Sequence, residues 1–245
     1  MKLLHCLVLV LVLVGASARR YQGRIVGGSQ ATDSQFPYQV SLRNTALTHI
    51  CGGSIISDYR VLTSAFCIYG KGPSDLFVAA GSNYLSNGTI LAVSRLLWYT
   101  SYNPNTLENN LAVIRTANRI LDVPKTGTVY LNIAGTLPGQ VCSLSGWGKR
   151  SSSASSYPNE LYYTTLKVIS LNDCRSFYPE YNLDNNVVCT EGGSAGGCDG
   201  DNGSPLVSSG IQIGILSWGI PCATGKPDVF VNVAPYNNWI TSTLV

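Results

Sequence analysis

Short runs of apolar and β-branched residues recur along this chain, and glycine, asparagine, serine and proline separate them. The runs span residues 38–42, 53–56, 77–80, 90–96, 111–114, 162–169, 211–218 and 229–233. Many short strands divided by turn residues predict an all-β fold of the sandwich or barrel type. The clearest helix candidate is 235–244, which opens with a proline and places apolar residues on one face. Residues 117–129 carry few strand signals and are a candidate link between two halves.

The N-terminus has the pattern of a secretory signal peptide. Lys2 precedes an apolar run over 3–14, and Ala16-Ser17-Ala18 supplies a small-residue cleavage site. The apolar run is too short for a comfortable membrane span. We therefore expect a signal peptide over 1–18, a short propeptide over 19–24, and a secreted, extracellular mature protein with no membrane partner.

Cysteine and charge counts narrow the class of protein further. Of the eight cysteines, Cys6 leaves with the signal peptide, so an odd number remains in an oxidising compartment and at least one is unpaired within the chain. Residues 1–24 hold four of the 16 lysines and arginines, so the mature chain carries 12 basic against 13 acidic side chains. So nearly neutral a chain gives no reason to expect a nucleic-acid partner.

Four segments together resemble a known family. They are RIVGGSQA (24–31), CGGSIISDYRVLTSAFC (51–67), CSLSGWG (142–148) and CDGDNGSPLV followed by ILSWG (198–219). In their order and spacing they are similar to the chymotrypsin- and trypsin-like serine proteases, and the resemblance covers 25–245. It implies two packed six-stranded antiparallel β-barrels, about 25–120 and about 121–245, with a cleft between them and a C-terminal helix.

The residues that the resemblance assigns to catalysis are replaced. Phe66 stands where the family has its histidine, Asn110 where it has its aspartate, and Asn202 where it has its nucleophilic serine. A hydroxyl nucleophile needs an adjacent base at neutral pH, and a phenyl ring accepts no proton. The remaining histidine of the mature chain, His49, lies in a strand-like run. Ser204, two residues after Asn202, has no obvious base. We therefore expect a protein that is not an enzyme, with no catalytic residue.

Other features of the family are retained. The Arg24–Ile25 junction resembles a zymogen activation site, and its cleavage would free the Ile25 ammonium to pair with Asp201. An unpaired buried carboxylate is costly, so Asp201 is interpreted as a requirement of the fold rather than of catalysis. Gly200 and Ser217-Trp218-Gly219 resemble the oxyanion position and the strand that pairs with a substrate. We interpret them as simple inheritance of the fold, and a working cleft is the alternative.

The resemblance also indicates an altered specificity pocket. At the pocket base the family often has an aspartate, and this chain has Gly196. On the opposite wall Asp228 replaces a family glycine, and Gly219 is the third residue that we assign to the pocket. Asp228 either selects a basic side chain or fills a disused pocket, and we favour obstruction.

The disulfide pairing is likewise implied by the resemblance. The family's partner for Cys142 is Ser208 here, so Cys142 is the odd thiol, either buried and inert or bridging to another molecule. The sequon at Asn87 is a candidate for N-glycosylation, whereas a second sequon at Asn202 falls in the expected cleft floor. The implied bridges, each stabilising by about 3 kcal/mol in the chain-entropy model, are Cys51–Cys67, Cys174–Cys189 and Cys198–Cys222.

The most specific resemblance is to the inactivated serine protease paralogues of the scabies mite, a parasite. Members of that group are secreted, have a replaced triad, and are associated with interference with host complement. The resemblance implies a binding protein for host proteins such as complement components, with no cofactor and no metal. Two alternatives stay open: a decoy for substrates or inhibitors of active sister proteases, and a weak residual hydrolase. The sequence does not determine the oligomeric state.

Overall fold

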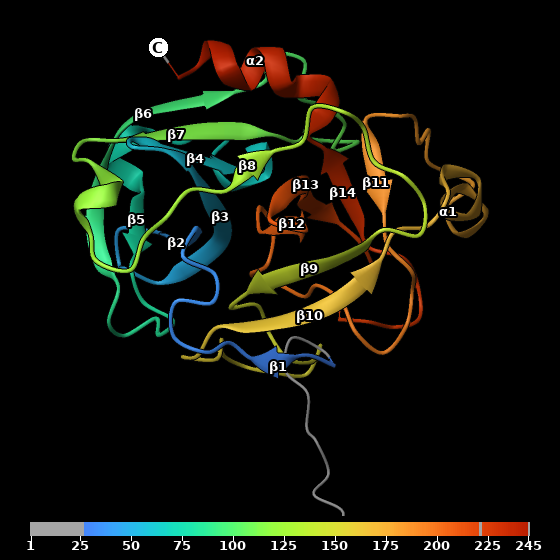
Figure 1. Cartoon of the computed structure of the whole chain (residues 1–245), viewed down its shortest axis with the longest axis horizontal. Helices are drawn as coiled ribbons and strands as arrows, with labels where there is room; N and C mark the ends of the chain where they lie inside the picture. Colours follow the sequence, from blue (N-terminus) through green and yellow to red (C-terminus); the bar gives the residue numbers. More distant parts are fainter. Residues whose placement is uncertain (1–26, 221, 245) are drawn as a thin grey trace, which may run out of the picture.

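The computed structural model describes residues 27–220 and 222–244, so the predicted signal peptide, the propeptide and the Arg24–Ile25 junction lie outside the described residues. Two β-sheets lie side by side (Figure 1), one built from the first half of the chain and the other mainly from the second. The first strand, β1 (Ser29–Gln30), pairs with β10 (Tyr162–Lys167) and so belongs to the second sheet.

The first sheet is a closed antiparallel barrel in the strand order β2-β3-β4-β7-β6-β5. Apolar residues from these strands point inward and form one buried cluster, in which Val40, Ile55, Val78 and Ile114 have no exposed surface. Because successive side chains of a strand point to opposite faces, the cluster takes alternate residues, such as Val40 and Leu42. The strands are β2 (Gln39–Arg43), β3 (His49–Ser57), β4 (Arg60–Thr63), β5 (Phe77–Ala80), β6 (Thr89–Trp98) and β7 (Ala112–Thr116).

The second sheet has the order β1-β10-β9-β12-β13-β14-β11, and β8 pairs with β13 beside this path. The path from β10 to β11 closes on itself through the isolated bridge Val168–Thr190, where the Ile169 N–H donates to the Cys189 carbonyl at 3.0 Å. The two sheets confirm the predicted all-β fold class: one is a closed six-stranded antiparallel barrel, and the other is an eight-stranded sheet whose path this bridge completes. Its other strands are β8 (Tyr130–Leu131), β9 (Val141–Gly146), β11 (Val187–Cys189), β12 (Pro205–Ser208), β13 (Ile211–Trp218) and β14 (Val229–Asn232).

A shared apolar cluster holds the two barrels together. It joins Leu62 and Val113 of the first barrel to Ile215 and Val231 of the second, and Ile240 of the C-terminal helix covers them. All five side chains are at most 3% exposed. The predicted C-terminal helix is present but shorter: Ala234–Tyr236 forms a 3₁₀ turn, and the α-helix α2 spans Asn237–Ser242.

One α-helix, α1 (Leu171–Phe177), was not predicted. The Ser170 hydroxyl caps it by accepting the Asp173 N–H at 3.1 Å and by donating to the Asp173 carboxylate at 2.6 Å. This serine with an acidic residue three positions later is a helix-start signature that the sequence does contain. Among the described residues, no helix is long and apolar enough to cross a bilayer. The other 3₁₀ turns are Ala65–Cys67, Pro73–Asp75 and Ile120–Asp122.

Candidate functional site

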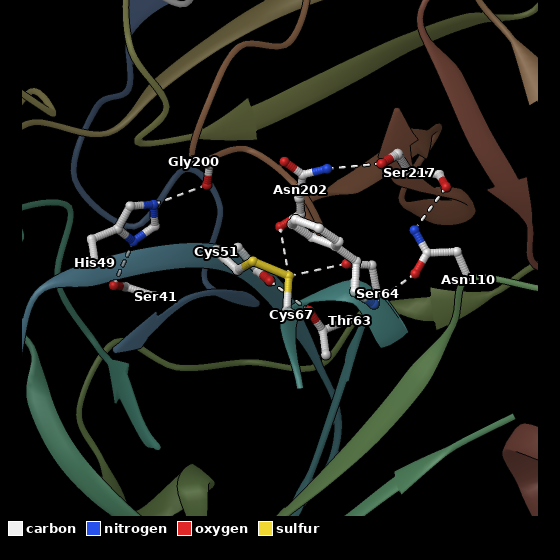
Figure 2. Close-up of a disulfide and its surroundings, with 12 residues drawn as sticks. Ser41, His49, Cys51, Thr63, Ser64, Cys67, Asn110, Gly200, Asn202 and Ser217 are labelled. Atoms are coloured by element: carbon white, nitrogen blue, oxygen red, sulfur yellow. Dashed lines mark hydrogen bonds between the residues drawn. A yellow bond between two sulfur atoms is a disulfide. The ribbon is translucent and has the colours of Figure 1, made fainter. Parts of the chain in front are cut away.

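Asn110 and Asn202 both contact Ser217 (Figure 2), although they are far apart in the sequence, and Phe66 is bonded to Asn110. Asn110 Oδ1 accepts the Phe66 backbone N–H at 2.7 Å, and Asn110 Nδ2 donates to Ser217 Oγ at 2.8 Å. Asn202 Nδ2 donates to the Ser217 carbonyl oxygen at 2.8 Å. The structure therefore brings together the three positions that the sequence singled out.

Local structure explains how Phe66 reaches this place. The 3₁₀ turn Ala65–Cys67 follows β4, and the Cys51–Cys67 disulfide ties its last residue to β3. The turn leaves the Phe66 ring at the surface, where the side chain is 55% exposed. A large exposed phenyl ring at the mouth of a cavity offers apolar contact to a ligand and no acid–base chemistry.

The contacts of the two asparagines are those of neutral amides. Asn110 is fully buried and uses its oxygen as an acceptor and its nitrogen as a donor, so its hydrogen bonds need no charge. Asn202 is partly buried, and its amide caps a backbone carbonyl of β13. Neither side chain is a nucleophile or a base at neutral pH, so the two amides can form hydrogen bonds but cannot carry a proton.

His49, the one histidine among the described residues, belongs to a different network. It opens β3 with 4% of its surface exposed, and its ring nitrogens lie 2.8 Å from Ser41 Oγ and 3.0 Å from the Gly200 carbonyl oxygen. Burial lowers the pKa of His49 to about 4, so the imidazole is neutral at pH 7. Figure 2 shows the ring directed at Gly200 and away from Asn202. Its role is to join the first barrel to the loop that carries Asn202.

Asp201 is completely buried beside that loop. Its Oδ1 accepts the Gly148 N–H at 2.7 Å and its Oδ2 accepts the Cys198 N–H at 3.1 Å. Burial raises the pKa of Asp201 to about 7, against the effect of these two bonds. No lysine or arginine of the described residues forms an ion pair with this carboxylate. The predicted partner, the Ile25 ammonium, lies outside the described residues.

The Asp228 side chain lies at a cavity of about 190 Å³ between Phe66 and Trp218. Its Oδ2 accepts the Gly197 N–H at 2.7 Å, and a Cβ added at Gly196 would lie 2.6 Å from the same oxygen. Asp228 therefore takes the space that a side chain at Gly196 would need. Burial raises the pKa of Asp228 to about 6, so the carboxylate is mostly ionised at pH 7. The cavity beside it is open, so Asp228 fills the pocket only in part.

A larger cavity of about 520 Å³ continues along Trp218 and was not predicted. Tyr181 packs against Trp218 with ring centroids 4.5 Å apart, and Glu108, Glu180 and Asp184 line the same space. Its walls come from the segments 105–109 and 180–187. The aspartate, glutamate and asparagine residues of these two loops were the available signal in the sequence. Nothing in their spacing indicates that the two loops face one another.

The remaining predicted residues lie away from the cleft floor or beneath it. The three expected disulfides are present, and Cys142 is a buried free thiol whose pKa burial raises to about 12. Ser204 is fully buried, and its Oγ has no hydrogen-bond partner among the described residues. Asn87 is exposed in the turn before β6, where its side chain is accessible. The described residues contain no cluster of three or more histidine, cysteine, aspartate or glutamate side chains suited to a metal ion.

Comparison with known proteins shows a consistent similarity. The chain matches the family model described as Trypsin over residues 25–240. It is 38% identical to Trypsin alpha of Drosophila melanogaster over 225 residues, which cover 90% of this chain and 88% of that protein. It is 37% identical to Trypsin beta of Drosophila erecta over 222 residues, covering 89% and 87%. Trypsin Blo t 3 of Blomia tropicalis is 37% identical over 234 residues, covering 89% and 85%.

Proposed function

The chain belongs to the trypsin family of serine proteases, and from that premise we propose that it is a secreted pseudoprotease, a binding protein that hydrolyses no peptide bond. The observation that carries the proposal is the composition of the cleft floor. Phe66, Asn110 and Asn202 occupy the positions that the family's motifs assign to base, orienting acid and nucleophile, and none of them can move a proton.

No other group replaces the missing base. His49 is bonded to Ser41 and Gly200, and its pKa of about 4 makes it a poor proton acceptor at neutral pH. Ser204, the hydroxyl nearest in sequence to Asn202, is fully buried and has no partner to activate it. In subtilisin, loss of the nucleophile or the base alone costs roughly 10⁶ in rate. A residual activity on the order of 10³–10⁴ over water is too small for useful proteolysis.

Secretion is supported by two kinds of feature. The three disulfides are of the kind that forms and persists in an oxidising compartment, and the leader over 1–18 has the pattern of a signal peptide. We include in the proposal that cleavage after Arg24 frees the Ile25 ammonium, which pairs with Asp201. Such a cation would offset the desolvation that raises the pKa of that carboxylate.

The catalytic part of the proposal is tested on mature protein cleaved after Arg24. The protein is incubated with a broad library of peptide substrates and with a fluorophosphonate reagent that labels active serines, and an active trypsin is run in parallel. We expect neither hydrolysis above the buffer rate nor labelling. Hydrolysis by the clean protein that the reagent abolishes would refute the proposal.

The partners that we propose are host defence proteins, with complement components first, as the resemblance to the mite paralogues implies. Immobilised mature protein is exposed to host serum, and bound proteins are identified and compared with those on a denatured sample. We expect complement components on the folded protein only, together with reduced complement-mediated lysis. Normal lysis in all pathways, with no complement component bound, would count against this partner.

A second candidate function, a decoy in the cleft, is favoured by one observation. The open cavity of about 190 Å³ beside the Asp228 carboxylate suits a basic side chain. Benzamidine, an amidinium ion, probes this directly. Because the carboxylate ionises around pH 6, a decoy cleft binds benzamidine about tenfold more tightly at pH 8 than at pH 5. Asp228→Asn should abolish the binding, whereas Asp199→Asn, which removes a more exposed carboxylate at the same cavity, should retain it. No binding at pH 8 would leave the cleft without this role.

A further inference from the structure

The four most exposed large hydrophobic side chains of the described residues lie within twelve positions of one another. Tyr130, Ile133, Leu137 and Val141 are 79%, 77%, 71% and 61% exposed, and the next in rank is Phe66 at 55%. Scattered exposed apolar residues are normal on a protein surface, but contiguous ones mark interaction sites. We call these four residues, together with Ile211, the apolar patch.

The strands of the second barrel make this patch contiguous. Ile211, which is 41% exposed, opens β13 directly opposite Tyr130 of β8. On its other side it pairs with Ser208 of β12, whose hydroxyl donates to the Val141 carbonyl oxygen of β9 at 2.8 Å. The exposed residues Tyr130, Ile211 and Val141 thus lie across neighbouring strands at one end of the second sheet.

The connection from β8 to β9 holds the remaining two residues against this end. Asn132 Nδ2 donates to the Gly135 carbonyl oxygen at 2.9 Å, and the Asn132 N–H donates to the Gln212 carbonyl oxygen at 3.0 Å. The Leu137 N–H donates to Gln140 Oε1 at 2.7 Å. Ile133 and Leu137 therefore lie on a loop that its own hydrogen bonds hold in place and that is bonded at one end to β13. Their side chains are exposed because the loop is held in this conformation.

Charge is absent from the segments that build the patch. Residues 126–148 and 202–225 contain no aspartate, glutamate, lysine or arginine. Lys167, which pairs with Val141 in the β10–β9 register, is a charged residue at the rim. Surfaces that face only water normally carry charges, and the cores of protein interfaces are depleted of them.

The patch is remote from the cleft. Ile211 is the first residue of β13 and Trp218, at the cavities described above, is the last. Residues in a strand rise about 3.3 Å each, so the two ends lie roughly 20 Å apart. A partner on the patch leaves the cleft accessible.

We propose that the apolar patch is a dimerisation surface, on which a second copy of this chain packs about a two-fold axis. In such a contact each patch residue meets the same surface of its partner, so like charges would face one another wherever the surface is charged. A neutral patch avoids this repulsion, which is the property that favours a second copy as the occupant.

The size of the patch sets the expected affinity. A large exposed apolar patch on a monomer covers on the order of 300–600 Å². A standard interface buries about 800 Å² on each partner, so polar neighbours must complete this one. We therefore expect a dimer with a dissociation constant in the micromolar range. It would carry two outward clefts, and a partner that offers two sites would bind it with increased avidity.

Sedimentation velocity of the full secreted protein, over a range of concentrations in non-reducing buffer, tests the proposal. We expect a reversible monomer–dimer equilibrium, and we expect Ile133→Asp to raise the dissociation constant at least about 100-fold, because each dimer would then bury two like charges. Leu47→Asp makes the same change at a 45% exposed position of the first barrel and should leave the equilibrium unchanged. Near-ultraviolet circular dichroism checks that both variants are folded.

Three results would overturn the proposal. The first is a monomer at all concentrations, and the second is a dimer that Ile133→Asp leaves intact. The third is a dimer that Cys142→Ser dissociates, because that dimer would depend on a thiol bridge. Patch-dependent capture of a lipid vesicle or of a serum protein by a chain that stays monomeric would equally reject a second copy as the occupant.

Discussion

Replacing Ser208 with cysteine is expected to create a fourth disulfide, with Cys142 as its partner. The β12–β9 register pairs Val207 with Ser143, so the next pair along the two strands is Ser208 with Cys142. Cys142 is 2% exposed and its thiol forms no disulfide. The two positions are thus adjacent, and one of them already carries sulfur.

The stabilisation follows from the length of the loop that the bond would close. About 65 residues separate the two positions, which gives roughly 4 kcal/mol in the chain-entropy model. The substitution also removes the hydrogen bond from the Ser208 hydroxyl to the Val141 carbonyl oxygen, at a cost of about 1 kcal/mol. The net gain of about 3 kcal/mol should raise the melting temperature by about 6–12 °C in a domain of this size.

Two measurements check this expectation. Thiol titration of the unfolded mature protein should find one free thiol in the parent chain and none in Ser208→Cys. Thermal unfolding without reductant gives the shift, and Ser208→Ala, which loses the same hydrogen bond without gaining sulfur, is the matched control. Two free thiols in the variant, or a bond without the shift, would contradict the reasoning from register and loop length.

Three further predictions concern the cleft and the core. Asn202→Ser alone should restore no hydrolysis, since no base lies beside that position, and turnover by this variant would mean that an unrecognised base is present. The single imidazole signal of His49 in the mature protein should titrate near pH 4, and a midpoint near 6.5 would refute its burial. Because the pKa of His49 in the folded protein is lowered from 6.5, about 3 kcal/mol of stability is present above pH 6.5 and is lost as the pH falls towards 4. Gly203→Ala should lower the free energy of unfolding by about 2–4 kcal/mol, because φ is +81° and the added Cβ would lie 2.2 Å from Thr63 Oγ1. Gly210→Ala, at φ +80° in open space, should lower it by about 1 kcal/mol. Equal losses measured by unfolding in denaturant would contradict this steric argument.

The fold was predictable because its strands repeat a simple pattern and its motifs are specific. Phe77–Ala80 and Ile211–Trp218 have the predicted bounds, since a glycine follows each run. The run over 53–56 and the strand-like run at His49 were treated separately, whereas the structure joins them in one strand, β3, in which His49 finds buried partners. The helix α1 was missed because its seven residues are too few for a clear apolar face.

The sequence singled out three positions that the structure brings together, whereas it did not predict their contacts. Family motifs identified Phe66, Asn110 and Asn202, but only the structure shows that Ser217 connects the two asparagines through its hydroxyl and its carbonyl. Obstruction of the pocket by Asp228 was the favoured expectation, and the open cavity beside the carboxylate narrows it to partial filling. Pocket volume depends on side-chain directions from several loops, and spacing in the sequence does not encode those.

The hydrogen bonds of Asn110 have a consequence for how the proposed loss of catalytic activity is detected. The side chain accepts a backbone N–H with its oxygen and reaches the Ser217 hydroxyl with its nitrogen, so it satisfies its buried surroundings completely. Melting temperature and yield report how well this buried position is satisfied, and neither measures whether the group there supports turnover. Conservation of shape in this chain is therefore no guide to conservation of turnover.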